Sequence, residues 1–291
     1  MDGTRRQLSM IANRLGSKSF FIFLGSLLFL GLTLVPMIAA QSDTLETDLE
    51  FGAIDWETGV VRAKGLGVPP DSVDNPTQRR AMAKRAARIV AYQRLLEITQ
   101  GIKINSRTLV KNLMVESEEI AAEVKGIVKG AQVVKEQPFT DGSFEVTVEM
   151  NLTKIESSLP NGPKIRKPEF APTSSVQPQP ANMDYTGLVV NAQGLNVREC
   201  LDPKIKMEDG QIVYARDLWP EAKLGVVGYV KGVTTAEMHD KVKSNPLVVK
   251  ALRIDAGSET DFVINQADAQ SIYLEPKNEK LLQEGKVVIA Y

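Results

Sequence analysis

The side chains on which most catalytic and metal sites depend are scarce in this chain. Among 291 residues there is one cysteine, Cys200, and one histidine, His239. A single cysteine cannot form an intramolecular disulfide bond, and a lone thiol without a neighbouring histidine is usually a core or surface residue. A histidine-based zinc site or a Ser-His-Asp triad would have to be built around His239 alone. We therefore predict a protein that is not an enzyme, with no catalytic residues, no metal and no cofactor.

An excess of basic residues is also missing. Four of the 35 Lys and Arg residues and one of the 36 Asp and Glu residues lie in the first 40 positions, which leaves a net charge of −4 on the rest. An acidic surface repels phosphate groups, so we exclude nucleic acid as a general partner. The content of hydrophobic residues, 43%, and of charged residues, 24%, is ordinary for a globular protein.

Long apolar runs are absent except near the N-terminus. One run extends from Phe20 to Ala40 and follows a leader with four basic residues, Arg5, Arg6, Arg14 and Lys18. This arrangement predicts export, either through a signal peptide cleaved after Ala40 or through an uncleaved N-terminal membrane anchor. Both alternatives place the remainder in the periplasm or the outer cell envelope, because the positive charge stays inside.

A change in composition divides the rest of the chain into two parts. The stretch from Leu159 to Ala181 is rich in Pro, Ser and Gln and contains six prolines, which resist packing and favour extended geometry. We therefore predict four segments: a leader at residues 1–40, a first domain at 45–157, a Pro-rich linker at 158–182 and a second domain at 183–291.

Local signals predict the elements of the first domain. A turn at Glu57–Gly59 and alternating polarity up to Leu152 indicate two hairpins, the second formed with residues 131–136. Asn75 and the proline after it predict the start of a helix that runs to about Gln100, and a second helix is expected at about 106–125. We expect the long helix to face the sheet with a stripe of mostly large apolar residues, namely Met82, Ala86, Ile89, Val90, Tyr92 and Leu96.

The second domain contains short apolar runs that predict strands. They are Gly187–Asn191, Ile212–Tyr214, Leu224–Val230, Leu247–Ile254, Phe262–Ile264 and Lys286–Tyr291, with short helices at Ala267–Ile272 and Pro276–Glu284. The last strand is expected to be buried. Together the two halves predict an α+β fold of two small domains, each a mainly antiparallel sheet with helices on one face.

Four stretches of the first domain, at residues 52–67, 80–87, 128–134 and 141–149, resemble a known family. They are similar to the N-terminal domain of the flagellar assembly protein T (FlgT) group and of the small surface lipoproteins classed with it. The resemblance covers about residues 50–155. It implies an exported α+β domain without catalytic residues, and some members of the group form collars around the flagellar motor. The lipid-attachment cysteine of the lipoprotein members is missing here.

Basic residues gather on the long helix and suggest a contact surface. We predict that Arg80, Lys84 and Arg88 bind a partner, and the alternative is a solvated helix face balanced by acidic residues elsewhere. The leading hypothesis is a non-enzymatic scaffold or assembly protein of the periplasm or envelope, with flagellar-motor association as one form. Its expected partners are envelope or flagellar basal-body proteins, with peptidoglycan, a membrane surface and a second copy of the chain as further alternatives.

Two other function classes remain open. A peptidoglycan-binding or small-ligand-binding module would use groups near Asn191 to Arg198, where Leu195–Arg198 resembles part of a bacterial SH3 sequence. A hydrolase that uses carboxylates alone is the third hypothesis, because paired acids need no fixed spacing in the sequence.

Overall fold

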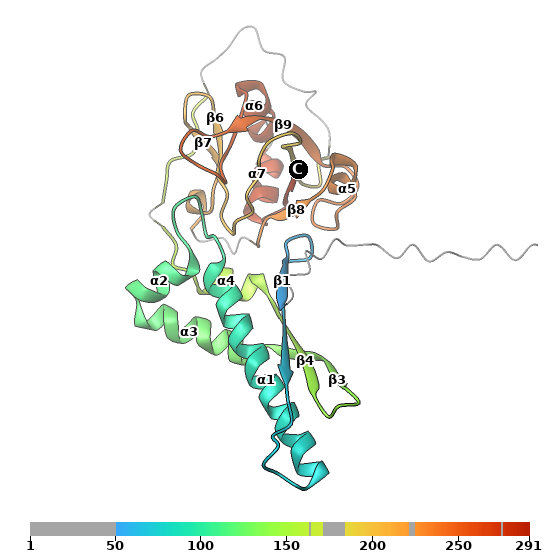
Figure 1. Cartoon of the computed structure of the whole chain (residues 1–291). Coiled ribbons are helices and arrows are strands. Elements are labelled where there is room, and N and C mark those ends of the chain that lie inside the picture. Colours follow the sequence, from blue (N-terminus) through green and yellow to red (C-terminus); the bar gives the residue numbers. More distant parts are fainter. Residues whose placement is uncertain (1–50, 163, 171–183, 221–224, 275) are drawn as a thin grey trace, which may run out of the picture. The chain divides into compact units, whose positions relative to one another are not determined.

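The computed structural model describes residues 51–162, 164–170, 184–220, 225–274 and 276–291 (Figure 1). The predicted leader at residues 1–40 and most of the predicted linker lie outside these ranges. Within them, no helix has both the length and the apolar character needed to cross a bilayer. The α+β class is confirmed, with one sheet on each side of the linker.

The first sheet has four antiparallel strands in the order β1-β2-β4-β3. Their bounds are β1 Gly52–Asp55, β2 Val60–Gly67, β3 Gln132–Pro138 and β4 Phe144–Asn151. Both predicted hairpins are confirmed, because β1 pairs with β2 and β3 pairs with β4. Neither connection needs more than a short turn, which is why local sequence signals were sufficient to predict them.

Four helices accompany this sheet: α1 Pro76–Gly101, α2 Val110–Glu116, α3 Glu118–Lys129 and α4 Leu152–Ser158. The predicted start of α1 is confirmed, since the Asn75 side chain accepts hydrogen bonds from the backbone N–H groups of Thr77 and Gln78 at 2.9 and 3.1 Å. The predicted second helix is divided into α2 and α3 at Ser117. This serine accepts a bond from Ile120 N and caps the new helix.

The predicted apolar stripe of α1 is wrong for most of its residues, and only Tyr92 and Leu96 pack, half-buried, against the core. The residues buried against the sheet are mostly small, namely Ala83, Ala87, Ala91, Leu95 and Thr99, whereas Met82 is 43% exposed and Ile89 is 50% exposed. The cause lies in β2, because a Cβ atom on Gly65 would be 2.2 Å from the Ala87 carbonyl oxygen. The helix backbone therefore rests directly on the strand, which leaves no room for large side chains between them.

The second sheet has seven strands in the order β7-β6-β10-β9-β5-β11-β8. It includes each of the predicted strands and one that was missed, β6. The pairings of β5 with β9 and β11, of β11 with β8 and of β6 with β10 are parallel, so this sheet is mixed and not mainly antiparallel as predicted. Its strands are β5 Leu188–Asn191, β6 Ile205–Met207, β7 Ile212–Tyr214, β8 Gly228–Val230, β9 Leu247–Ile254, β10 Phe262–Ile264 and β11 Val287–Ala290.

Helices cover both faces of the second sheet, which corrects the prediction of one covered face. Helix α5 (Val233–Glu237) packs on the face that carries Val189 and Val288. Helices α6 (Gln266–Tyr273) and α7 (Pro276–Gln283) pack in the core of the opposite face. The four residues of β11 are all fully buried, as predicted, and strands with two buried faces read as continuous apolar runs.

The described residues all fall within one compact unit. Leu201 and Val226, which follow the linker, belong to the core of the first sheet. Trp56, in the β1–β2 turn, packs in the core of the second sheet, and its ring meets that of Tyr229 edge-on at 5.6 Å.

Candidate functional site

The three predicted binding residues share one flank of α1. Arg80, Lys84 and Arg88 are four residues apart, which places them on successive turns of one side. Lys84 Nζ lies 2.5 Å from Glu136 Oε2 of β3, and Arg88 Nη2 lies 2.9 Å from Oε1 of the same carboxylate. We call Arg80, Lys84 and Arg88 the basic flank. It connects the helix to the edge strand β3.

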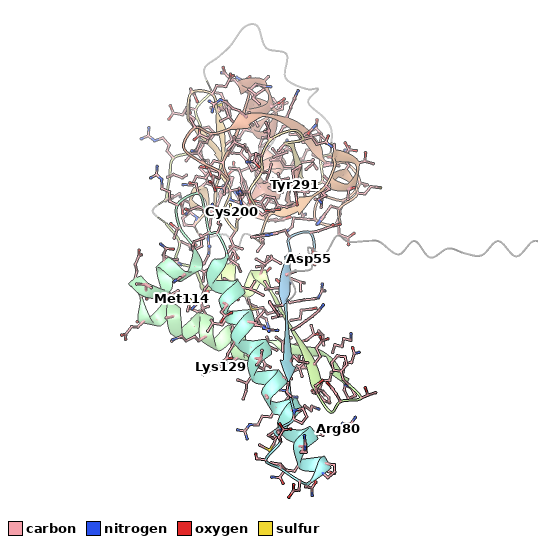
Figure 2. All side chains as sticks on the ribbon, viewed as in Figure 1. Asp55, Arg80, Met114, Lys129, Cys200 and Tyr291 are labelled. Carbon is pink, nitrogen blue, oxygen red and sulfur yellow. The ribbon has the colours of Figure 1, made fainter. Side chains whose placement is uncertain are left out.

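The basic flank is only partly neutralised. The hydrogen bonds from Lys84 and Arg88 lower the pKa of the Glu136 carboxyl, which stays ionised between them. Arg80 is exposed and forms no ion pair with a described residue (Figure 2). Two of the three cations share one carboxylate and Arg80 has none among the described residues, so the flank retains a local excess of positive charge.

Other basic residues of α1 do not contribute to this surface. Arg79 pairs with Asp71 at 3.3 Å. Arg94 donates to the Lys64 carbonyl oxygen at 2.8 Å, and its guanidinium lies 4.0 Å from the centroid of the Phe51 ring. The predicted basic face thus reduces to the basic flank and to exposed Arg85 on the back of the helix.

The strand next to the basic flank is unusually exposed. Six of the seven residues of β3 are exposed and the seventh is half-buried, because α1 packs on β2 and β4 instead. Its apolar residues Val133 and Val134 are 36% and 49% exposed, and Phe139, just after the strand, is 38% exposed. Sequence reasoning paired this segment with β4 correctly but gave no sign that it would be left uncovered.

The one histidine and the one cysteine of the sequence are held by structural bonds. His239 Nδ1 accepts a hydrogen bond from Lys241 N at 3.1 Å, so Nε2 carries the proton and donates to the Glu57 carbonyl oxygen at 3.0 Å. Cys200 is fully buried beside the Tyr229 hydroxyl, and burial raises the pKa of its thiol to about 12. The core interpretation of Cys200 is confirmed, and neither residue is poised to react.

The segment of the alternative hypothesis, Asn191 to Arg198, begins at the end of β5. The Asn191 side chain accepts a bond from Gln193 N at 3.1 Å, and Gly194 adopts φ +81° in the turn that follows. Because β5 is parallel to both of its neighbours, this turn lies at the carboxyl ends of parallel strands. Ligands of open α/β sheets bind at such ends.

A buried cluster of charges was missed by sequence reasoning. Arg216, in the short helical turn η1 (Arg216–Leu218), has a side chain that is only 13% exposed. Its Nη2 donates to the carbonyl oxygens of Glu156 at 3.0 Å and Leu159 at 3.3 Å, and its Nη1 lies 3.6 Å from Glu156 Oε1. Asp202 accepts a bond from Arg216 N at 3.1 Å. Since these residues lie in three separate segments, no sequence pattern could group them.

Burial perturbs several acids and bases of this cluster. It raises the pKa of Asp202 to about 6 and also raises the pKa of the Glu156 carboxyl. Burial also lowers the pKa of Lys241, whose charge interacts with that of Glu156, and we count this lysine as the fourth residue of the cluster. Strongly perturbed groups often mark functional sites, but structural ion-pair networks perturb them equally.

The bonds of the cluster favour a structural role. Arg216 holds the carbonyl groups at the end of α4, and Asp217 accepts bonds from Gly162 N and Ile165 N, both at 3.0 Å. The first residues after α4 are thus fixed to η1. We call Glu156, Asp202, Arg216 and Lys241 the junction cluster. Nowhere in the described ranges do three or more His, Cys, Asp or Glu side chains gather as a metal site would require.

Comparison with known proteins bears on the second sheet. Residues 187–291, just over a third of the 291-residue chain, match a family model described as the second domain of Treponema pallidum Tp0624. The match spans all seven strands of that sheet and does not extend to residues 50–155, where the FlgT resemblance lies. No match was found among the curated proteins. From β5 to β11, the chain is therefore similar to the second domain of Tp0624.

Proposed function

We propose that this chain is a non-enzymatic scaffold or assembly protein of the cell envelope that acts by docking other proteins. The observation that carries the proposal is the distribution of its side chains. His239 and Cys200 are held in structural bonds, whereas a local excess of positive charge and exposed apolar residues lie together on the basic flank and β3. Exposed apolar groups rimmed by charge are typical of protein-binding surfaces.

Export and a flagellar role belong to the same proposal but have separate support. The basic leader and the apolar run up to Ala40 favour export to the periplasm or the outer envelope. The FlgT resemblance over about residues 50–155 favours association with the flagellar basal body. The Tp0624 match concerns the second sheet and does not bear on this point.

Site-specific photocrosslinking in cells tests the docking role. A photoreactive residue at position 80 should capture one or more envelope proteins, because Arg80 lies on the proposed surface. The matched control is position 252, where Leu252 is exposed on the second sheet. Equal capture at both positions, or none at position 80, would contradict docking through the basic flank.

A deletion strain tests the flagellar form separately. Loss of swimming together with a missing periplasmic collar, both restored by complementation, is the expected result. Normal motors and normal swimming would contradict the flagellar role. The docking proposal would then be decided by the crosslinking experiment alone.

The turn after β5 supports a second candidate function, a peptidoglycan-binding or small-ligand-binding module. Its position at the carboxyl ends of parallel strands favours this candidate. Sedimentation of the purified chain with peptidoglycan tests it, with exposed Asn196 and Arg198 each replaced by alanine. Reduced sedimentation of these variants is expected, and a chain that never sediments would contradict the candidate.

A further inference from the structure

The free edge of β3 is the strongest unassigned feature of the molecule. β3 is the last strand in the order β1-β2-β4-β3, and β4 is its only partner among the strands that the structure describes. The backbone N–H and C=O groups on its outer side are therefore available to another strand. Such an edge is a template for pairing with an extended segment of a second chain.

Charge indicates what kind of segment this edge would accept. Glu136 faces α1, where the three cations of the basic flank outnumber it. Lys135 is adjacent to Glu136 and, because side chains alternate along a strand, it lies on the opposite face of the sheet. Positive charge is thus in excess on the α1 face, and on the opposite face Lys135 is the one charged residue of β3, with Glu145 and Glu149 of β4 behind it.

We propose that the edge of β3 binds an extended, acid-rich segment of a partner protein, which adds a fifth strand to the first sheet. The proposal rests on the docking function proposed above and names the partner's chemistry. An added strand lies about 5 Å beyond β3. Its side chains on one face would approach Arg80 and Arg88, and those on the other face would approach Lys135.

The same charges disfavour pairing between two copies of this chain. Two β3 edges brought together would place two basic flanks and two Lys135 side chains near one another, and like charges across a strand pair are destabilising. Edge lysines are a common device against self-association. Pro138 has no N–H to donate, so the pairing segment is expected to lie within Gln132–Gln137.

Hydrogen exchange of the full-length chain with synthetic peptides tests strand addition. The probe is a capped ten-residue peptide of alternating Glu and Thr, and the control replaces Glu with Lys. The Glu peptide should slow amide exchange in β3 by about tenfold at saturation, and the Lys peptide should have no effect. Protection elsewhere without protection of β3, or equal protection by both peptides, would overturn the proposal.

A version of the Glu peptide that is N-methylated at every residue tests the backbone pairing. It keeps the carboxylates and lacks the N–H groups of both edges, so it should fail to protect β3. Protection of β3 equal to that by the unmethylated peptide would show that the peptide binds without forming a strand, and the proposal would be wrong.

A matched pair of charge reversals tests the role of the basic flank. Arg80→Glu should weaken binding of the Glu peptide about two- to fivefold, as expected for an exposed ion pair. Arg85→Glu makes the same change of charge about 140° around the helix, and it should leave binding unchanged. Equal losses in the two variants would overturn the role of the flank. Position 80 capturing an envelope protein in cells without any peptide protection of β3 would retain the scaffold and refute strand addition.

Discussion

Gly67 and Ala83 are in backbone contact across the interface between β2 and α1. A Cβ atom added to the glycine would lie 2.0 Å from the alanine carbonyl oxygen, a distance that no relaxed structure tolerates. Gly65 stands in the same relation to Ala87 and Ala91 on the next turn. The absence of two side chains on β2 thus sets the distance between the helix and the sheet.

Replacing Gly67 with alanine is expected to destabilise the first sheet. The obstacle is helix backbone, which cannot rotate away as a side chain can, so α1 must shift as a whole. We expect a loss of about 3 kcal/mol in the free energy of unfolding, at the upper end for overpacked sites. Urea denaturation followed by circular dichroism measures it.

The control for this prediction is Gly126→Ala in α3, where no atom lies within 4 Å of the added Cβ. That variant should be neutral or slightly stabilising, since alanine is the better helix former. A Gly67→Ala protein as stable as the parent would show that the close contact does not constrain the fold.

The junction cluster is expected to make stability depend on pH. The pKa of Asp202 rises from 3.8 to about 6 because the carboxyl is buried. The folded state therefore binds the proton more tightly than the unfolded state. The resulting stabilisation is complete below the unfolded pKa and is lost as pH rises through the folded one. The melting temperature should therefore fall as pH rises from about 4 to about 6, between the unfolded and folded pKa values.

Asp202→Asn should flatten this dependence, because an amide retains the oxygen that accepts from Arg216 N and removes the charge. The raised pKa of Glu156 acts in the same direction, so part of the slope should remain. Glu136→Gln is a useful contrast. The bonds from Lys84 and Arg88 lower the pKa of Glu136, so ionisation of this carboxyl stabilises the fold as pH rises, opposite in sign to Asp202. If the melting temperature of Asp202→Asn falls with pH as steeply as that of the parent, Asp202 is not the source of the pH dependence.

Removing the Arg216 guanidinium is expected to be costly. Arg216→Met leaves the Leu159 carbonyl oxygen without its donor, removes one of two donors to the Glu156 carbonyl oxygen, and leaves the Glu156 carboxylate buried without its cation. A loss of roughly 3–5 kcal/mol is typical for breaking a buried pair on one side. Chemical denaturation of the full-length chain measures this loss.

Arg253→Met serves as the matched control. The Arg253 side chain is half-exposed, and its Nη1 lies 3.5 Å from Asp255 Oδ1, which makes this a weak surface ion pair. Its loss should be below about 1 kcal/mol. Adding Glu156→Gln to Arg216→Met should restore part of the stability. Additive losses in the double variant would argue against coupling between the two side chains.

Truncation after Gly285 should unfold the second sheet before the first. It removes β11, which pairs with β5 on one side and β8 on the other and is fully buried. Hydrogen exchange should report lost protection in β5, β8 and β9, with β2 and β4 less affected. An unchanged melting transition would contradict this prediction.

The sequence was sufficient where a single segment decides the structure. Asn75 caps α1 through bonds to residues two and three positions later, and the turn at Glu57–Gly59 joins adjacent strands. The prediction of which α1 residues are buried failed for the opposite reason. The face that α1 buries is chosen by Gly65 and Gly67 on another element, and the periodicity of the helix alone favoured larger side chains.

Pairing order and buried charge were beyond sequence reasoning for a related reason. The parallel neighbours of β5 are β9 and β11, far along the chain, and alternation within a strand does not reveal its partners. For the candidate site, the helical spacing of Arg80, Lys84 and Arg88 was visible in the sequence. The pairing of Lys84 and Arg88 with Glu136 depends on how α1 crosses the sheet, and the sequence did not show it.

The position of β11 has a consequence for when the molecule can fold. In the second sheet β11 lies between β5 and β8, yet the ribosome produces it after every other strand of that sheet. Until β11 has been made, β5 lacks one of its neighbours and the edge strand β8 has no partner strand, while all four strands of the first sheet are present once β4 exists. Nascent chains fold their N-terminal regions first, and here the delay keeps the second half loose throughout synthesis. Under the export proposed above, such a delay would keep the second half open for passage through a translocation channel.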